Sequence, residues 1–210
     1  MCTNFVPTQN TVWVKEQFDV DLPFPFPLET YPGYLTPIVL RHPKTDVTCG
    51  LAKFGLIPHW AKDASFGRHT YNARAETVAE KPSYRTPWKK QQNCLVLADS
   101  FFEPNYESGK AVRWEIKRGD LEPMAIASIY DSWLDKESGE WVTSFSMLTI
   151  NADTHPVMNQ FHKAGDEKRT PVILRSEYFQ KWLSATPVVA KEMMSLDVLP
   201  ELVSQAHPKR

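Results

Sequence analysis

The sequence predicts an α+β fold, in which a mainly antiparallel, curled or barrel-like sheet forms the core and a few helices lie at its periphery. Short apolar segments, typical of buried strands, alternate with turn residues through most of the chain. Helical patterns are few and short, and 17 prolines stand against only 8 glycines. With 210 residues and an ordinary globular composition, we expect a single domain over residues 1–210.

The first part of the chain predicts one helix followed by an extended segment. Asn10 is a candidate cap for a helix that ends near Phe18. Residues 21–37 are rich in proline, which alternates with phenylalanine over residues 23–27. Each proline removes an N–H and restrains the residue before it to extended geometry. We therefore expect an extended surface segment whose phenylalanines turn inward. An interdomain linker is the alternative, but the 20 residues before it are too few for a domain.

Strand patterns dominate the middle of the chain. Residues 94–98 are entirely apolar, which indicates a fully buried strand. Residues 112–117 alternate apolar and charged side chains, which is the pattern of a strand with one face exposed to solvent. Further strands are expected at residues 38–40, 49–57, 124–130 and 141–150. Turns between them, such as the one at Ser138-Gly139, favour consecutive antiparallel hairpins and hence a curled sheet or barrel.

Two more helices are expected in the last third of the chain. Asp153 is a candidate cap for a helix that runs toward Phe161. Ser176 is a candidate cap for a clearer one, because an apolar stripe follows it as far as Leu183. The tail from Pro200 is expected to add one last short turn.

Composition excludes several classes of protein. The 24 basic and 25 acidic residues leave a net charge of −1, which excludes a globally basic nucleic-acid binder but not a local basic groove. No run of 18 apolar residues predicts a membrane span, and the N-terminus lacks the features of a secretory signal. Cys2, Cys49 and Cys94 are too few and too scattered for a disulfide framework or a zinc site. We expect a cytoplasmic protein, nucleoid-associated if it is bacterial, with no metal or cofactor.

Cys2 is the most informative residue for chemistry. Aminopeptidases remove an initiator methionine that precedes a small side chain, which would leave an α-amine and a thiol on adjacent carbons. Reference pKa values of about 8 for the amine and about 8.5 for the thiol give both a reactive fraction near neutral pH. Such a 1,2-aminothiol condenses with an aldehyde to an imine and then closes a five-membered thiazolidine. Position alone favours a frayed terminus whose cysteine has no role.

Several segments together resemble one protein family. Tyr71-Asn72-Ala73-Arg74-Ala75-Glu76-Thr77 is one, Asp99-Ser100-Phe101-Phe102-Glu103 is another, and Phe161-His162 followed by Arg169-Thr170-Pro171 is a third. Two more segments belong to the set: Met1-Cys2 at the start of the chain, and Phe54-Gly55-Leu56-Ile57-Pro58-His59-Trp60 before the first of the three. Together they are similar to the SOS-response-associated peptidase (SRAP) family. The similarity runs from residue 2 to about residue 183.

The resemblance implies a role in the DNA damage response. Family members recognise abasic sites in single-stranded DNA and crosslink to the ring-opened sugar aldehyde through the N-terminal cysteine, a lyase-like chemistry. They also remove the initiator methionine autoproteolytically, which is the hydrolase activity behind the word peptidase. By the match, Cys2 is the nucleophile, and Asn72, Glu103 and His162 are its active-site partners.

The residue types suit that chemistry. A carboxyl group after an apolar strand should have a raised pKa, which fits Glu103 to open the closed sugar by proton transfer. His162 titrates in a useful range and could shuttle protons, whereas Asn72 can only hold the α-amine or a sugar oxygen by hydrogen bonds. The alternatives are a solvated strand end for Glu103, a surface or capping residue for His162 and a turn former for Asn72. His155 lacks the neighbours that a metal site needs.

DNA contacts are expected at four residues. By the match, Arg74 contacts a phosphate near the lesion and Thr149 lies close to the bound DNA, while Arg169 is a further candidate. Trp60 could stack on an exposed base or be a core residue. Two basic stretches could also follow a phosphate backbone, although charge runs are usually solvated faces: Lys81, Arg85, Lys89 and Lys90, and then Lys163, Lys168, Arg169 and Arg175.

The chain also departs from the family pattern. Thr3-Asn4 replaces the usual Gly-Arg after the cysteine, so a DNA contact is lost or supplied elsewhere, and Pro104 replaces a tryptophan. Five extra residues, 163–167, separate His162 from Arg169 and are expected to form a longer loop. Two other functions remain open. One is an N-terminal-nucleophile thiol hydrolase acting on other molecules, and the other is a non-covalent module that binds single-stranded DNA.

Overall fold

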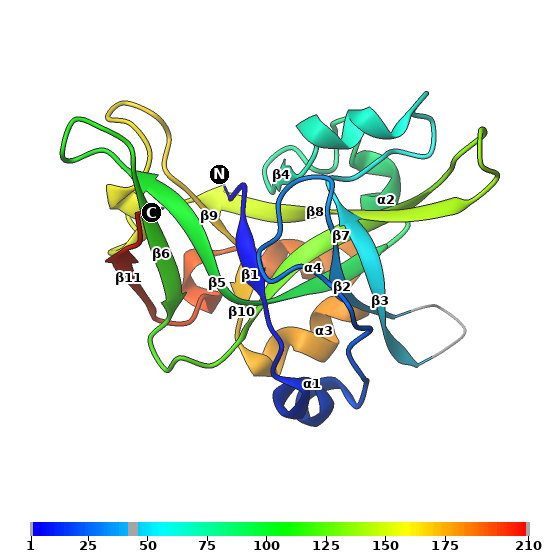
Figure 1. The fold of residues 1–210 in the computed structure, drawn as a ribbon, viewed down its shortest axis with the longest axis horizontal. Helices are drawn as coiled ribbons and strands as arrows, with labels where there is room; N and C mark the ends of the chain where they lie inside the picture. Colours follow the sequence, from blue (N-terminus) through cyan, green and yellow to red (C-terminus); the bar gives the residue numbers. More distant parts are fainter. Residues whose placement is uncertain (1, 42–45, 209–210) are drawn as a thin grey trace.

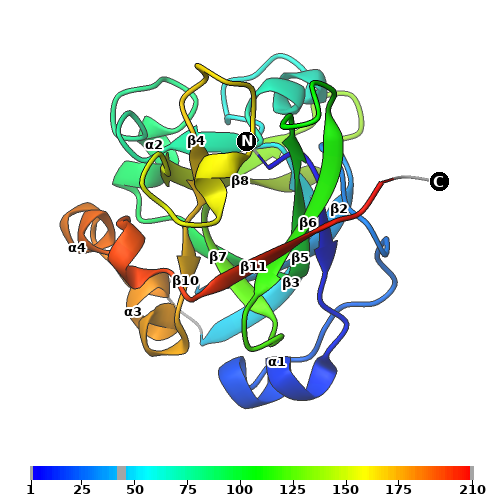
Figure 2. The same ribbon diagram turned by 90° about the vertical axis from the view of Figure 1, so that its left-hand side faces the viewer.

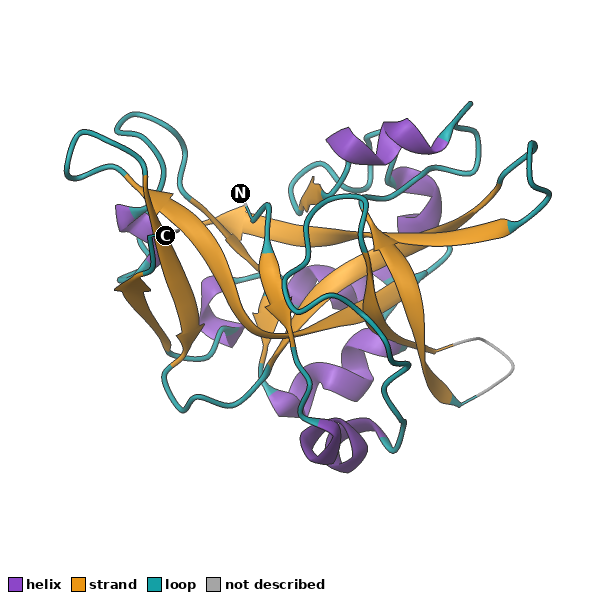
Figure 3. Cartoon of the chain, in the orientation of Figure 1, coloured by secondary structure: helices purple, strands orange, loops and turns teal. Residues whose placement is uncertain are grey.

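The computed structural model describes residues 2–41 and 46–208, and its core is a closed five-stranded barrel (Figures 1 and 3). The barrel strands pair in the order β7-β8-β3-β2-β5, and β5 pairs again with β7 to close the ring. Their bounds are β2 Leu35–Arg41, β3 Val47–Phe54, β5 Asn93–Asn105, β7 Met124–Leu134 and β8 Trp141–Asn151. The predicted α+β class with a barrel-like core is therefore confirmed.

An odd number of strands explains why the barrel is not purely antiparallel. Directions cannot alternate around a ring of five, so at least one neighbouring pair must be parallel. That pair is β3 and β8, in which Lys53 lies opposite Ser144 and Phe54 opposite Phe145. The Phe54 and Phe145 rings stack inside the barrel with their centroids 5.2 Å apart. The expectation of consecutive hairpins is correct for β2–β3, β5–β6 and β7–β8, but wrong at this closure.

Six further strands extend the sheet outside the barrel. β6 (Val112–Arg118) pairs with the last part of β5, and β11 (Leu202–Ala206) pairs with β6. β1 (Phe5–Pro7) also pairs with β5, whereas β4 (Asn72–Arg74) and β9 (Arg169–Pro171) pair with β8. β10 (Ile173–Leu174) pairs with β7. β4 and β9 thus approach the same end of β8, which brings two distant parts of the chain together.

Short helices lie around the outside of the barrel (Figures 1 and 2). α1 (Thr11–Phe18) begins where the Asn10 side chain accepts a hydrogen bond from the Trp13 amide, as expected from the sequence. α1 packs against α3 (Phe179–Leu183), since the Phe18 and Phe179 rings stack 5.3 Å apart. α2 (Arg85–Lys89) and α4 (Pro187–Glu192) lie on one side of the molecule (Figure 2). None of the helices formed by the described residues has the length and apolar character of a membrane span.

Two expected elements are wrong. Residues 153–161 form turns and a single 3-10 turn, Met158–Gln160, because Pro156 lacks an N–H and the Asp153 carboxylate accepts the distant Lys168 amide instead of capping a helix. The tail from Pro200 forms strand β11, because the exposed edge of β6 offers it a ladder of hydrogen bonds.

Two other segments differ in detail from expectation. The helix expected after Ser176 begins as a 3-10 turn, Ser176–Tyr178, without a side-chain cap, and continues as α3. Residues 21–34 are largely irregular, and Leu35 already belongs to β2. Phe24 is half exposed and stacks on Phe26 instead of turning inward.

Candidate active site around Cys2

The N-terminal segment is held in place on both sides. Phe5 exchanges two backbone hydrogen bonds with Thr30, at 3.2 and 2.8 Å, and pairs with Phe101 of β5 on its other side. The Phe102 amide donates to the Asn4 carbonyl at 3.1 Å, which continues the pairing toward the N-terminus. Cys2 is fully buried as a result. The alternative of a frayed terminus is therefore wrong.

Asn4 is fixed by a cluster around Glu29. The Asn4 side-chain amide, the Tyr31 hydroxyl and the Arg113 guanidinium all donate to the same carboxylate oxygen of Glu29. The Arg113 guanidinium also lies over the Phe102 ring, 3.2 Å from its centroid. Position 4, where the family pattern has arginine, thus serves to anchor the N-terminal segment beside β5.

Asn72 contacts Cys2 directly. It lies in β4, whose parallel pairing with β8 sets Asn72 opposite Met147. The Asn72 amide nitrogen donates to the Cys2 carbonyl at 2.7 Å, and the Tyr84 hydroxyl donates to the Asn72 carbonyl at 3.0 Å. The other side-chain atom of Asn72, Oδ1, is buried and has no hydrogen-bond partner among the described residues. An acceptor therefore remains for one more donor beside Cys2.

Glu103 and His162 form a second contact at the same site. Glu103 lies within β5, in the part that has left the barrel to pair with β6, and it is 2% exposed. His162 Nε2 lies 3.3 Å from Glu103 Oε2. The His162 backbone adopts a left-handed conformation (φ 64°), and its amide donates to the Pro104 carbonyl at 2.9 Å. This backbone contact sets the imidazole beside the carboxyl group.

Burial governs the protonation of this site. It raises the pKa of the Glu103 carboxyl to about 7 and, as the main cause, lowers the pKa of His162 to about 4. Near neutral pH the imidazole is neutral and the Glu103 carboxyl group is partly protonated, so the two groups do not form a fixed ion pair. Burial, followed by the charge of Glu103, also raises the pKa of the Cys2 thiol well above its usual range. Cys2 therefore carries its proton until a reaction removes it.

Tyr71 is a member of the site to which the sequence assigned no role. Burial raises the pKa of its hydroxyl, and the charges of Cys2 and Glu103 raise it further, which places the phenol within their electrostatic reach. Its ring also meets Phe54 edge to face, with centroids 5.8 Å apart. Its only sequence signal is that it directly precedes Asn72.

Trp60 lies on a separate loop that follows β3. The Trp60 side chain is about half exposed and packs edge to face on Phe66, with ring centroids 5.1 Å apart. The preceding His59 is anchored to Asp131, which accepts from its amide at 3.2 Å and contacts its ring at 3.3 Å. One face of the indole is therefore held at the surface, so Trp60 is not a core residue.

Arg74, Thr149 and Arg169 gather where β4 and β9 flank β8, but only Arg74 reaches the surface. Arg169 is 2% exposed; it donates to both carboxylate oxygens of Glu76, at 2.9 and 2.8 Å, and to the Thr149 carbonyl at 2.6 Å. Thr149 is fully buried. The Arg74 side chain is half exposed and donates to Glu167 at 2.7 Å. In this conformation Thr149 and Arg169 lie beneath the surface that Arg74 presents.

The described residues contain no group of three or more His, Cys, Asp or Glu side chains that could hold a metal ion. His155 instead has a structural role. Its Nδ1 accepts hydrogen bonds from the amides of Val157 and Met158, at 3.1 and 3.2 Å, and it holds the turn that leads to His162.

Comparison with known proteins gives relatives that cover most of this chain. The abasic site processing protein YoaM of Bacillus subtilis (strain 168) is 30% identical over 190 residues, which cover 88% of this chain and 79% of that protein. The abasic site processing protein HMCES of Xenopus tropicalis is 27% identical over 165 residues, which cover 69% of this chain and 47% of that protein.

The fold and the family agree with these relatives. A crystal structure of a protein from Bordetella bronchiseptica matches with a TM-score of 0.88 at 29% identity, over 99% of this chain and 100% of that one. A family model described as SOS response associated peptidase (SRAP) matches residues 1–207. Since that match spans nearly the whole sequence, the chain belongs to the SRAP family.

Proposed function

We propose that the protein binds single-stranded DNA and captures abasic sites covalently through Cys2, as a thiazolidine. The observation that carries the proposal is the placement of Cys2, which Asn72 holds at 2.7 Å and which lies within the electrostatic reach of Glu103, itself paired with His162. The names of its relatives, abasic site processing proteins, supply the class of substrate.

The first step is the opening of the sugar. An abasic deoxyribose is mostly a cyclic hemiacetal, so a proton must move from the anomeric hydroxyl to the ring oxygen before an aldehyde forms. The Glu103 carboxyl group, with a pKa raised to about 7, gives its proton to the ring oxygen. The carboxylate left on Glu103, which His162 contacts at 3.3 Å, then takes up the proton that the anomeric hydroxyl loses as the aldehyde forms. No net change in protons results.

The second step joins protein and DNA. The α-amine of Cys2 adds to the aldehyde carbon, and loss of one water gives an imine. The thiol sulfur then adds to the same carbon and its proton passes to the nitrogen, which closes a five-membered ring without any oxidant. The unpartnered Oδ1 of Asn72 accepts a hydrogen bond from the amine during this step.

Removal of Met1 must come before capture, because an acylated nitrogen cannot form the imine. Met1 lies outside the described residues, and its autoproteolytic removal by Cys2 is part of the proposal. The fully buried thiol and the Glu103–His162 pair, a proton donor and acceptor near neutral pH, support it.

Binding before capture depends on the DNA backbone and on stacking, because the recognised feature is a missing base. Arg74 supplies a phosphate contact and Trp60 a ring for an adjacent base; both side chains are about half exposed. Arg169 and Thr149 support this surface from below by fixing Glu76 and β4.

A denaturing gel tests the proposal. Untagged protein is incubated with an abasic single-stranded oligonucleotide, and the adduct is compared for wild type, Cys2→Ala and the matched control Cys49→Ala. We expect an adduct with wild type and with Cys49→Ala only. An N-terminal tag that is not removed should abolish the adduct while binding persists. A crosslink that survives Cys2→Ala unchanged contradicts the mechanism.

A thiol hydrolase is the second candidate, and one observation favours it: a neutral imidazole contacts Glu103, whose charge acts on the buried Cys2 thiol. It also requires a free Cys2, so the substrate distinguishes the two functions. Turnover of glutamine or of a peptide without any DNA adduct would support the hydrolase. Salt-sensitive binding of single strands with neither adduct nor turnover would leave a non-covalent module.

A further inference from the structure

The two basic stretches in the sequence have different environments. In the second stretch, three of the four cations are held by contacts within the protein. Lys168 Nζ donates to the carbonyls of His162 and Lys163, at 3.2 and 2.8 Å, Arg169 is buried against Glu76, and Arg175 donates to the Asp197 carbonyl. Carboxylates thus neutralise Arg169, while bonds to carbonyls hold the Lys168 and Arg175 side chains against the protein. The first stretch lies on and around α2, where the surroundings differ.

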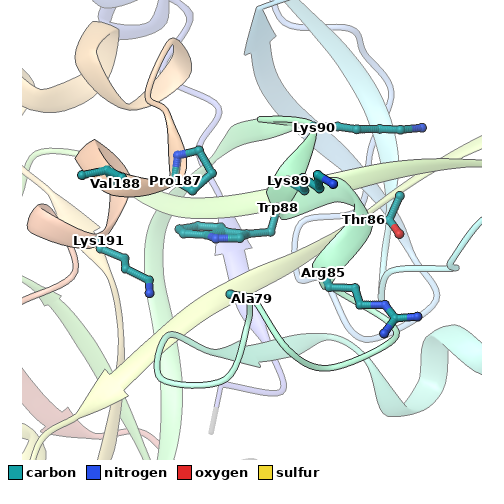
Figure 4. A pocket seen from close by; sticks show the side chains of 9 residues that line it. All are labelled: Ala79, Arg85, Thr86, Trp88, Lys89, Lys90, Pro187, Val188 and Lys191. Carbon is teal, nitrogen blue, oxygen red and sulfur yellow. The ribbon is translucent and has the colours of Figure 1, made fainter.

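A hollow of about 850 Å³ lies between α2 and α4 (Figure 4). Trp88, which is 3% exposed, forms its apolar floor together with Pro187, and the exposed Val188 adds an apolar side chain at its edge. Four cations surround this floor: Arg85, Lys89, Lys90 and Lys191. We call this hollow with its lining the α2–α4 groove.

The charge of the α2–α4 groove is not neutralised within the protein. The residues that line the hollow include no acidic side chain. Among the described residues, none of the four cations takes part in a salt bridge or a side-chain hydrogen bond. All four side chains belong to exposed residues, so the groove combines an apolar floor with a ring of free positive charge. That chemistry fits a polyanion that also carries flat apolar groups.

The groove is connected to the Cys2 site. Tyr84, the residue before α2, donates to the Asn72 carbonyl, and Asn72 donates to the Cys2 carbonyl. Lys191 also lines a second hollow of about 440 Å³ that reaches Glu76, two residues beyond Arg74. Figure 2 shows β4 between α2 and the N-terminus. The surface thus continues from the groove toward the proposed lesion site.

We propose that the α2–α4 groove binds the single-stranded DNA that flanks the abasic site, with phosphates on the cations and a base over the apolar floor. The inference rests on the proposed function, because only a strand anchored near Cys2 would extend along this side. Single-stranded DNA is the occupant because it pairs one negative charge with one flat base per nucleotide, which matches both parts of the groove. The volume also suits nucleotide-sized groups.

The test removes three cations and leaves the site untouched. The variant Lys89→Ala/Lys90→Ala/Lys191→Ala is compared with Lys15→Ala/Lys136→Ala/Lys181→Ala, which removes the same charge from exposed residues that do not line the groove. Binding of an undamaged strand of about 20 nucleotides is followed by fluorescence anisotropy over a range of salt concentrations. Circular dichroism checks that both variants fold.

We expect the groove variant to bind the long strand about tenfold more weakly at low salt, with a salt slope smaller by about 2, since each single-strand phosphate contact contributes about 0.7. Its adduct yield with a saturating short abasic oligonucleotide should equal that of wild type. The control variant should keep the wild-type slope.

The outcomes separate this inference from the proposed function. If the groove variant binds with the affinity and slope of the control, the inference is wrong even when capture through Cys2 proceeds. If wild type forms no adduct, the proposed function fails, while the salt slopes still decide whether the groove binds single strands. If polyglutamate of matched charge competes as well as DNA, the groove is a site for acidic peptides, and the inference is overturned.

Discussion

At the scale of single residues, the chemistry depends on two groups that burial keeps close to neutral. An exposed glutamate is fully ionised at pH 7 and could not donate a proton, but Glu103 is 2% exposed and its pKa is raised to about 7. His162, with a pKa lowered to about 4, stays uncharged beside it. At neutral pH Glu103 can therefore either donate or accept a proton beside this neutral imidazole.

The raised pKa of Glu103 has a consequence for stability. The folded state holds a proton that the unfolded state releases near its ordinary pKa of 4.5, so this contribution to stability is lost as pH rises from about 4.5 to 7. Glu103→Gln removes the titration. We expect the variant to gain melting temperature relative to wild type at pH 8, and to gain less at pH 5, as measured by thermal denaturation.

The same variant tests catalysis. Without the carboxyl group, sugar opening loses its acid, and we expect adduct formation to slow by about a hundredfold or more. Glu115→Gln is the matched control, because Glu115 lies in β6 and bonds to Gln205 away from Cys2. An equal Tm difference between wild type and Glu103→Gln at both pH values would contradict the assigned protonation.

Asn72 provides a second prediction at this scale. Asn72→Asp replaces the amide that donates to the Cys2 carbonyl with a carboxylate that repels it. We expect adduct formation to slow about tenfold or more, while binding of undamaged single strands changes little. The two rates are compared in a single-turnover time course. Equal loss of binding and of adduct formation would show that Asn72 only supports the fold.

The sequence identifies some of these residues and not others, for a physical reason. Cys2, Asn72, Glu103 and His162 stand in recognisable segments, and the structure brings all four to one site. Glu29 has no such signal, because its three donors come from positions 4, 31 and 113 and meet only in the folded chain. Contacts of this kind depend on strand register, which local patterns do not encode.

At the scale of elements, the extra loop 163–167 affects the proposed DNA surface. Its Glu167 accepts from Arg74 at 2.7 Å and from Arg169 at 2.6 Å, so a carboxylate occupies the place where a phosphate would meet Arg74. Under the proposed function, DNA displaces this carboxylate from Arg74. The sequence predicts the longer loop. It does not predict that Glu167 pairs with Arg74 and Arg169, because the pairing with Arg74 forms only in the folded chain.

Glu167→Gln should therefore increase affinity. A half-exposed ion pair of this kind contributes up to about 1 kcal/mol, which DNA must overcome to reach Arg74. Without it, we expect single strands to bind about twofold to fivefold more tightly at low salt. Fluorescence anisotropy measures the change, with Glu137→Gln in the β7–β8 hairpin as a control. Weaker binding by Glu167→Gln would mean that the loop helps to hold DNA.

The helices and strands are predicted correctly where local sequence alone decides the structure, and wrongly where a contact with a distant part of the chain overrides it. The helix capped by Asn10 and the buried strand at 94–98 depend on local signals and are correct. Asp153 has the sequence of a cap, but its carboxylate bonds to Lys168, fifteen residues away. The sequence predicts a turn for the tail, whereas the structure has strand β11 there, because the unpaired edge of β6 to which it binds exists only in the folded chain.

At the scale of the whole molecule, the closed barrel separates a rigid core from its additions. β2, β7 and residues 94–96 of β5 pair on both sides, whereas β11 pairs only with β6. We expect hydrogen exchange followed by mass spectrometry to show that β11 loses protection well before β7. Equal protection of the two strands would mean that β11 belongs to the same cooperative unit as the barrel.

The barrel also explains why a nucleophile at the chain terminus can be positioned. β1 pairs with the part of β5 that bridges the barrel and the outer sheet, and Glu103 lies further along that same part. β1, which begins at Phe5, three residues after Cys2, thus connects the terminus to a strand of the closed barrel. The sequence predicted the class of the sheet, but not this shared strand.

Intact-mass analysis of the untagged protein, with and without a uracil-excised single-stranded oligonucleotide, tests capture by Cys2 most directly. We expect the free protein to lack Met1, and the mixture to contain a species whose mass is the sum of protein and oligonucleotide less one water. Cys2→Ala should give no such species. A protein that retains Met1, or that shows no mass increase under conditions where it binds the oligonucleotide, would contradict the mechanism.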